Sequence, residues 1–286
     1  MNRLLLIGIC LFLAAFCLGC SPQAQQAQVV TTTLPVYEFT AALCSGTDIS
    51  VSRLITQEVS CLHDYSLQSQ QMRAIEGAEL VVISGGGLED FLGDVLHQKN
   101  VIDASAEISF HHGHSHDGHD HEHDPHIWLD PQNAKIMVQT IAQGLTETYP
   151  QHSELIQKNA QKLLTELETL YAYGTAQLSD LQCRELVTFH DGFSYLAEAF
   201  DLTILHAVEE ESGSEASAKD LIGIINIVRA HQLPSIFTER NGSNSAARII
   251  SDETGAAIYP LDMAMSGNSY FEAMYHNIDT LKEALG

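Results

Sequence analysis

Four side chains that can bind a metal ion lie at comparable places along the chain. His63 and His190 each follow a predicted strand and precede a predicted helix, and Asp262 follows the predicted strand at 257–261. His126 lies between a histidine-rich segment and a long helical region. In open α/β sheets, ligands bind outside the carboxyl ends of the strands. A single histidine in such a place is more often structural, but three in matching contexts predict a site for a divalent cation.

The histidine-rich segment differs in character from the rest of the chain. Residues 111–126 read HHGHSHDGHDHEHDPH, with eight histidines among glycine, serine, aspartate and glutamate. Such a run has nothing with which to build a core, so we expect a flexible loop at 111–124. Its dense imidazole and carboxylate groups should bind divalent metal loosely and in several arrangements, although a merely solvated linker is the alternative. The auxiliary ligands in this loop would be His111, His112, His114, His116, His119, His121 and His123.

Strand and helix patterns alternate along the chain from about residue 28. The predicted strands are Val29–Leu34, Ile49–Ile55, Leu80–Ser84, Val101–Ala104, Leu186–Phe189, Thr203–Ala207, Ser235–Thr238 and Ala257–Leu261. Helical patterns between them predict an α/β fold with mostly parallel sheets flanked by helices.

A long amphipathic helix, predicted at His152–Leu181, interrupts this alternation. Its apolar side chains recur at i, i+3 and i+4. At 1.5 Å per residue it would be about 45 Å long, enough to run the length of a protein with two lobes. We therefore expect an N-terminal lobe at 28–130, a helical spine at 131–182 and a C-terminal lobe at 183–286.

The chain is strongly acidic. Its 286 residues include 13 lysines and arginines against 37 aspartates and glutamates, for a formal charge of −24. Holding a phosphate backbone or an anionic membrane surface depends on basic side chains. We therefore expect no nucleic-acid partner, and a cationic ligand suits the charge.

The N-terminus has the pattern of an export signal. A basic start is followed by an apolar run over 4–16, which is too short to span a bilayer comfortably, and then by Leu18-Gly19-Cys20. This ending resembles a bacterial lipoprotein signal, in which the cysteine is lipidated and becomes the first residue. We expect a signal peptide at 1–19, lipidation of Cys20 and a tether at 20–27. The mature domain would then be extracytoplasmic and anchored to the bacterial cell membrane, at the cell surface or in the periplasm.

Cys44 and Cys61 flank the predicted strand at 49–55. Thiols outside the cytoplasm can oxidise, so we expect a disulfide between these two residues. A bridge that closes so short a loop would stabilise the fold by about 3 kcal/mol in the chain-entropy model. Two unpaired buried thiols are the alternative.

Five segments are distinctive when taken together. They are Cys61-Leu62-His63-Asp64-Tyr65-Ser66-Leu67, Asp124-Pro125-His126-Ile127-Trp128-Leu129-Asp130-Pro131, Phe189-His190-Asp191-Gly192-Phe193-Ser194-Tyr195, Thr238-Glu239-Arg240 and Tyr270-Phe271-Glu272-Ala273-Met274-Tyr275-His276-Asn277. They closely resemble the metal-binding lipoproteins of bacterial ABC importers, in the zinc- and manganese-specific cluster of solute receptors. The resemblance covers nearly the whole mature chain. It implies two α/β lobes joined by a rigid backbone helix, with one metal ion in the cleft between them.

Carried over residue by residue, the resemblance implies four metal ligands. His63 and His126 would come from the first lobe, and His190 and Asp262 from the second, with Glu239 as the alternative fourth ligand. Manganese receptors of this family tend to have a carboxylate where this chain has His190. Three imidazoles and one carboxylate form a tetrahedral site suited to Zn²⁺, whereas Mn²⁺ prefers more oxygen ligands.

The leading interpretation is a monomeric Zn²⁺ receptor that delivers its ion to an ABC permease, and not an enzyme. Asp64 and Asp191 would orient the imidazoles from behind. A manganese receptor is the alternative within the family. A zinc-dependent hydrolase would need an open coordination position and a general base, and the chain has no H-E-x-x-H helix. A metal-storing or adhesive surface protein without a permease is a third class.

Overall fold

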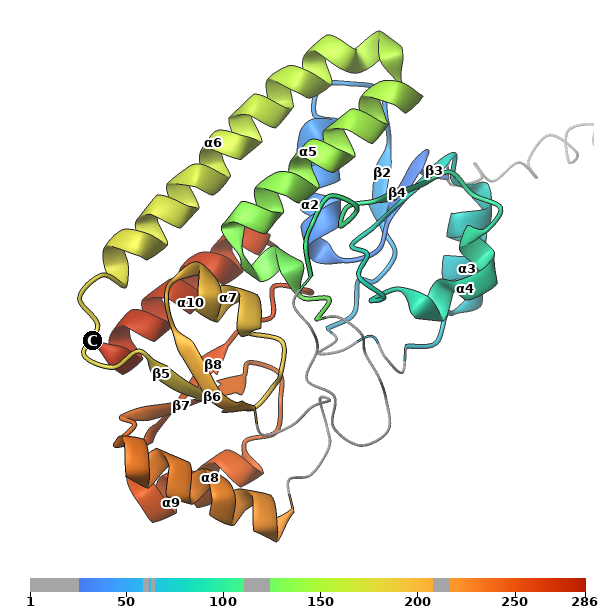
Figure 1. Ribbon diagram of the computed structural model, residues 1–286. Helices are drawn as coiled ribbons and strands as arrows, with labels where there is room; N and C mark the ends of the chain where they lie inside the picture. Colours follow the sequence, from blue (N-terminus) through green and yellow to red (C-terminus); the bar gives the residue numbers. More distant parts are fainter. Residues whose placement is uncertain (1–25, 59–61, 63–64, 111–123, 208–216) are drawn as a thin grey trace, which may run out of the picture.

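The strands form two separate sheets in the computed structural model, which describes residues 26–58, 62, 65–110, 124–207 and 217–286 (Figure 1). The sheet orders are β2-β1-β3-β4 and β6-β5-β7-β8, and every neighbouring pair is parallel, so the two halves repeat one topology. The strands are β1 (Val29–Thr31), β2 (Val51–Arg53), β3 (Leu80–Ile83), β4 (Val101–Asp103), β5 (Glu185–Thr188), β6 (Thr203–Ala207), β7 (Ser235–Glu239) and β8 (Ala257–Leu261). The predicted two-lobed α/β fold is confirmed, although some strands and the long helix end at other residues than predicted.

Helices separate the strands within each lobe. They are α2 (Leu34–Leu43), α3 (Ser69–Gly77), η1 (Asp90–Leu92) and α4 (Gly93–Leu96) in the first, and α7 (Ser194–Ala199), α8 (Ala218–His231), α9 (Ser245–Thr254) and α10 (Tyr270–Leu285) in the second. Local signals set several of their ends. Pro35 lies in the first turn of α2, where its missing N–H has no helical partner to lose. Ser217 and Asp220 form a capping box at the start of α8, and Gly255 ends α9 with a φ of 80°.

Two long helices, α5 (Pro131–Thr148) and α6 (Ser153–Gln177), connect the lobes. They follow η2 (Ile127–Leu129) and are joined by η3 (Pro150–His152). Helix α6 packs against α5, against α2 of the first lobe and against α10 of the second, and Figure 1 shows it running along one side of the molecule. The predicted long helix is therefore present. Its 25 residues span about 38 Å.

Helix α6 ends at Gln177, four residues before the predicted Leu181, and an arginine binds the carbonyl groups just beyond this end. Nη2 of Arg184 donates to the carbonyl oxygens of Leu178 and Ser179, at 2.8 and 3.0 Å. Its Nη1 donates to the carbonyls of Phe200 and Asp201, after α7. The guanidinium thereby fastens the end of the long helix to the second lobe.

The larger of two hydrophobic cores in the described residues extends through both lobes. It includes Val30 and Val81 of the first sheet, Met137 of α5, Leu163 of α6 and Leu281 of α10. A smaller core lies under α8 and α9 in the second lobe, around Val187, Ile224, Ile236 and Ile250. Because one core crosses the junction, the lobes are not independently packed units.

Hydrogen bonds also cross the junction between the lobes. Trp128, the only tryptophan of the chain, is fully buried and donates from Nε1 to the carbonyl of Met263 at 2.7 Å. The hydroxyl of Tyr270 donates in turn to the carbonyl of Trp128 at 2.8 Å. Arg53 of the first lobe donates from Nη1 to the carbonyl of Gly267 at 3.0 Å.

Several predicted features fall outside the described residues. They include the signal peptide at 1–19, Cys20, most of the tether and Cys61, so the Cys44–Cys61 disulfide stays a prediction. Cys44 is buried and forms no disulfide with Cys183, the other cysteine in the described part of the chain. Burial raises the pKa of the Cys44 thiol to about 12. Across those same residues, no helix has the length and apolar character needed to cross a bilayer.

Candidate metal centre

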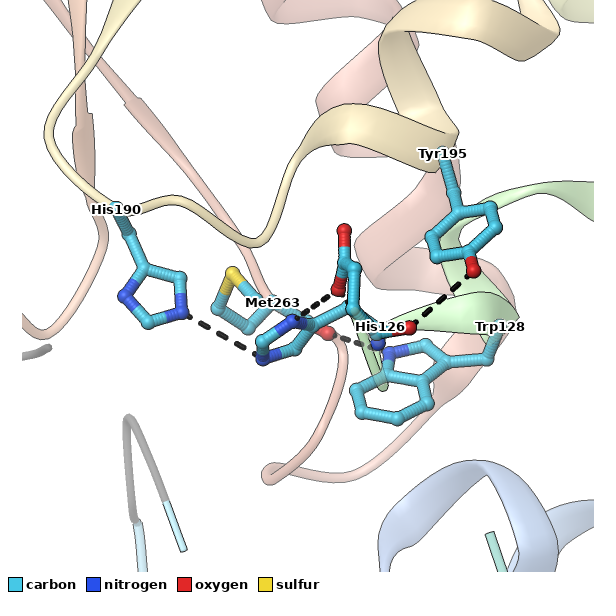
Figure 2. Close-up of polar contacts among 6 residues, drawn as sticks. His126, Trp128, His190, Tyr195 and Met263 are labelled. Atoms are coloured by element: carbon cyan, nitrogen blue, oxygen red, sulfur yellow. Dashed lines mark hydrogen bonds and ion pairs between the residues drawn. The ribbon is translucent and has the colours of Figure 1, made fainter. Parts of the chain in front are cut away.

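His126 and His190 meet at the junction of the two lobes. Nε2 of His190 lies 3.5 Å from Nε2 of His126, and the ring centroids are 5.2 Å apart. Both side chains are buried, and Figure 2 shows the ring nitrogens directed at each other. Two nitrogens bound to one tetrahedral Zn²⁺, each about 2.0–2.1 Å from the ion, would be about 3.3 Å apart. The pair therefore has the spacing of two ligands of one ion.

A buried carboxylate orients the first of these imidazoles. Oδ1 of Asp124 is 2.8 Å from Nδ1 of His126 and also accepts a hydrogen bond from the backbone N–H of His126 at 2.9 Å. This contact assigns the ring proton to Nδ1, which leaves the lone pair of Nε2 for a metal ion. The hydroxyl of Tyr195 donates to the carbonyl of Asp124 at 3.2 Å and fixes the segment from the second lobe (Figure 2).

The charge of Asp124 is also favoured by its surroundings. Burial by itself would raise the pKa of this carboxyl, but the hydrogen bond from His126 and the nearby His126 and His190 lower it overall. Asp124 therefore stays ionised behind the imidazole. A metal-bound histidine that donates to a carboxylate is a more basic and better-oriented ligand.

The role of Asp124 was not among the predictions from the sequence. Asp64 and Asp191 were expected to orient the imidazoles, and Asp64 lies outside the described residues. The signal available in the sequence was Asp124-Pro125-His126, in which an aspartate two residues before a histidine can accept from its backbone and its ring.

The walls of the centre leave little free space. A Cβ atom placed on Gly192 would lie 2.6 Å from Cε of Met263, 2.7 Å from Cδ2 of His190 and 2.8 Å from Nδ1 of His126. The ring of Trp128 is 5.5 Å from that of His126, centroid to centroid. The imidazoles are thus held between apolar groups and a glycine backbone.

Neither predicted carboxylate ligand, Asp262 or Glu239, forms with His126 and His190 a group of three that could hold one ion in the described part of the chain. Oδ2 of Asp262 accepts from Nη1 of Arg240 at 3.0 Å, and Oδ1 accepts from the backbone N–H of Ala264 at 2.8 Å. Glu239 is buried at the end of β7. Within the described ranges, no three His, Cys, Asp or Glu side chains lie close enough together to hold one metal ion.

His63 and the loop histidines His111, His112, His114, His116, His119, His121 and His123 lie outside the described residues. Leu62, next to His63 in sequence, is fully buried in the shared core.

Two parallel-sheet lobes with two paired imidazoles at their junction, one of them hydrogen-bonded to a buried carboxylate, define a two-lobed binding protein of the metal-receptor class. Residues 29–284 match the family model ZnuA, described as zinc-uptake complex component A, periplasmic. The chain belongs to this family. Its members are solute receptors and not enzymes, as the resemblance implied.

Similar proteins come from several bacteria. A protein of Treponema pallidum described as metal-binding is 29% identical over 295 residues, covering 96% of this chain and 93% of that protein. The zinc-binding lipoprotein AdcA of Streptococcus pneumoniae is 30% identical over 305 residues, and the match covers 98% of this chain but 60% of AdcA. The crystal structure of Zn(II)-bound AdcA from the same species superposes with a TM-score of 0.78 at 27% identity, over 91% of this chain and 58% of that one. The chain thus spans a little over half the length of AdcA and nearly all of the treponemal protein.

Proposed function

We propose that this protein is the extracytoplasmic Zn²⁺ receptor of an ABC importer, which captures the ion at the junction of its lobes and delivers it to a membrane permease. The observation that carries the proposal is the pair of buried Nε2 atoms 3.5 Å apart, one of them backed by Asp124. Membership of a zinc-uptake family and the zinc named for AdcA support it.

The proposed ligands are His63, His126, His190 and Asp262, with Glu239 as the alternative to Asp262. Two imidazoles already have the spacing that a tetrahedral ion needs, and a third with one carboxylate would complete a set suited to Zn²⁺. Mn²⁺, the alternative cargo, prefers more oxygen atoms and a higher coordination number. The histidines at 111–123 would bind further ions loosely, as an auxiliary store beside the tight site.

We propose further that the receptor is a monomer tethered to the membrane through lipidated Cys20, after removal of residues 1–19. The sequence Leu18-Gly19-Cys20 and the name of AdcA as a lipoprotein support this attachment. Membrane fractionation of a Cys20→Ser variant tests it.

Zinc titration of the metal-free full-length protein tests the receptor function. We expect one tight site in the wild type, and a loss of affinity of at least about 100-fold in His126→Ala and in His190→Ala, because each removes a direct ligand. His231→Ala is the matched control, since that histidine is exposed and pairs with Glu185 at 2.9 Å in the second lobe. It should bind zinc as the wild type does.

A deletion of 111–123 separates the tight site from the histidine-rich segment. The deletion variant should still bind one equivalent of zinc tightly and lose only the weaker zinc sites, because Asp124 and His126 are kept. If the deletion abolished tight binding while the two alanine variants retained it, the assignment would be wrong. Dependence of zinc uptake by cells on the protein would test delivery to a permease.

A further inference from the structure

The register of the second sheet places Arg240 beside Asp262. Strands β7 and β8 are parallel, and Glu239 pairs with Leu261 at their carboxyl ends. The next residue of each strand is therefore Arg240 on one side and Asp262 on the other. The backbone N–H of Arg240 donates to the carbonyl of Leu261 at 2.8 Å, which continues the pairing.

An ion pair follows from this placement. Nη1 of Arg240 lies 3.0 Å from Oδ2 of Asp262, and the arginine side chain is 58% exposed against 19% for the aspartate. The other oxygen, Oδ1, accepts from the N–H of Ala264 at 2.8 Å. Asn277 holds the backbone of Asp262 from both sides, by two hydrogen bonds of 2.7 Å. Each carboxylate oxygen thus has a donor, and the peptide that carries it is fixed.

These contacts limit what the carboxylate can offer to an ion. An oxygen that already accepts one hydrogen bond keeps a lone pair and can serve as a single ligand. Chelation by both oxygens would use the remaining lone pair of each, and the positive charge of Arg240 beside Oδ2 opposes a second cation at that oxygen. Of the two donors, only the exposed arginine side chain is free to swing aside. A four-coordinate Zn²⁺ needs one oxygen from this residue, whereas Mn²⁺ gains more from two.

We propose that Arg240 is a specificity-determining residue, which favours Zn²⁺ over Mn²⁺ by holding Oδ2 of Asp262 away from chelation. The inference rests on the proposed receptor function, in which Asp262 is the fourth ligand. In this inference Arg240 does not contact the ion itself and acts only by fixing the position of Asp262. An ion pair this exposed is weak, so its effect on the ratio of affinities is about three- to fivefold.

The test measures both ions on metal-free protein. Zn²⁺ is titrated by competition with a chelator, and Mn²⁺ by loss of the electron paramagnetic resonance signal of the hydrated ion. Arg240→Gln should lower the ratio of the Mn²⁺ to the Zn²⁺ dissociation constant about threefold or more. Arg240→Lys, which keeps a cation for Asp262, should keep the wild-type ratio.

Arg229→Gln is the control for loss of charge alone. Arg229 pairs with Glu253 at 3.2 Å in the same lobe, and both side chains are more than half exposed, at 53% and 60%. Removing its charge should leave the ratio unchanged. An unchanged ratio in Arg240→Gln, or an equal shift in Arg229→Gln, would overturn the role of Arg240.

The same titrations separate this inference from the function on which it rests. If the wild type bound zinc tightly and lost it in His190→Ala, but Arg240→Gln kept the wild-type ratio, only the role of Arg240 would fail. If the wild type bound no zinc tightly, the receptor function and this inference would fail together.

Discussion

Gly192 lies where any side chain would collide with the two histidines. The three atoms nearest to a Cβ added at this position belong to Met263, His190 and His126, all within 2.8 Å, and the two imidazoles are held in place by burial. The terminal methyl of a methionine can move aside, but in the proposed metal site a ring that presents Nε2 to the ion cannot turn freely. Position 192 therefore requires glycine, because the two imidazoles and Met263 lie so close to its backbone.

Gly192→Ala should weaken zinc binding about tenfold, because displacement of oriented ligands costs affinity even when the ligands remain. Gly223→Ala is the matched control: a Cβ at this position in α8 meets nothing within 4 Å. It should bind zinc normally and gain about 0.5–1 kcal/mol of stability, since alanine is the better helix former. Calorimetric titration and urea unfolding of both variants check this. Wild-type affinity in Gly192→Ala would show that the site has room to relax.

The turn after β3 shows how one buried acid organises an element. Gly85, Gly86 and Gly87 all have positive φ, at 86°, 67° and 86°. The carboxylate of Glu89 accepts hydrogen bonds from the N–H of Ser84 at 2.8 Å, the N–H of Gly85 at 3.0 Å and the hydroxyl of Thr32 at 2.6 Å. The backbone N–H groups of Ser84 and Gly85, at the start of this turn, are thus bound by a carboxylate of the chain itself.

Burial raises the pKa of Glu89 to about 7 despite these hydrogen bonds. The unfolded chain releases this proton near pH 4.5, so between about pH 4.5 and 7 the folded protein binds the additional proton. The contribution of Glu89 to the free energy of unfolding is therefore fully present below pH 4.5. It falls by up to about 3 kcal/mol as the pH rises through 7.

Glu89→Gln should remove this part of the pH dependence, because an amide does not titrate in this range. The variant also loses the hydrogen bond from one backbone N–H, so its stability at pH 5 should be lower than that of the wild type. Urea unfolding of metal-free protein at pH 5 and pH 8 measures both effects. Parallel pH profiles for the two proteins would contradict a raised pKa.

Over the whole molecule, the shared core and the hydrogen bonds of Trp128 and Tyr270 tie the lobes together. Helix α6 packs on both of them. We therefore expect one cooperative unfolding transition for the metal-free protein. The fluorescence of Trp128, the only tryptophan, reports the junction, and far-ultraviolet circular dichroism reports all helices. The two urea midpoints should coincide, and earlier loss of the tryptophan signal would show that the junction opens first.

Local sequence was enough to predict the elements and to single out the two histidines that meet at the junction of the lobes. Apolar spacing depends on neighbours a few residues away, so the eight strands and the long helix could be located from it. His126 and His190 stand out because of their residue type and their place beside strand ends and helix starts. Their meeting across 64 residues follows once each lobe is formed.

Only the tertiary structure decided which partner each charged group has. Asp124 orients His126 because its carboxylate turns back to the ring and backbone of His126, and because Tyr195 of the other lobe donates to the carbonyl of Asp124. Asp262 pairs with Arg240 because the register of β7 and β8 places the two residues side by side, and Arg184 binds the carbonyl groups just after the end of α6. Each of these contacts joins residues whose pairing cannot be inferred from their neighbours along the chain. They depend on how separate elements pack, and no periodicity along the sequence encodes that.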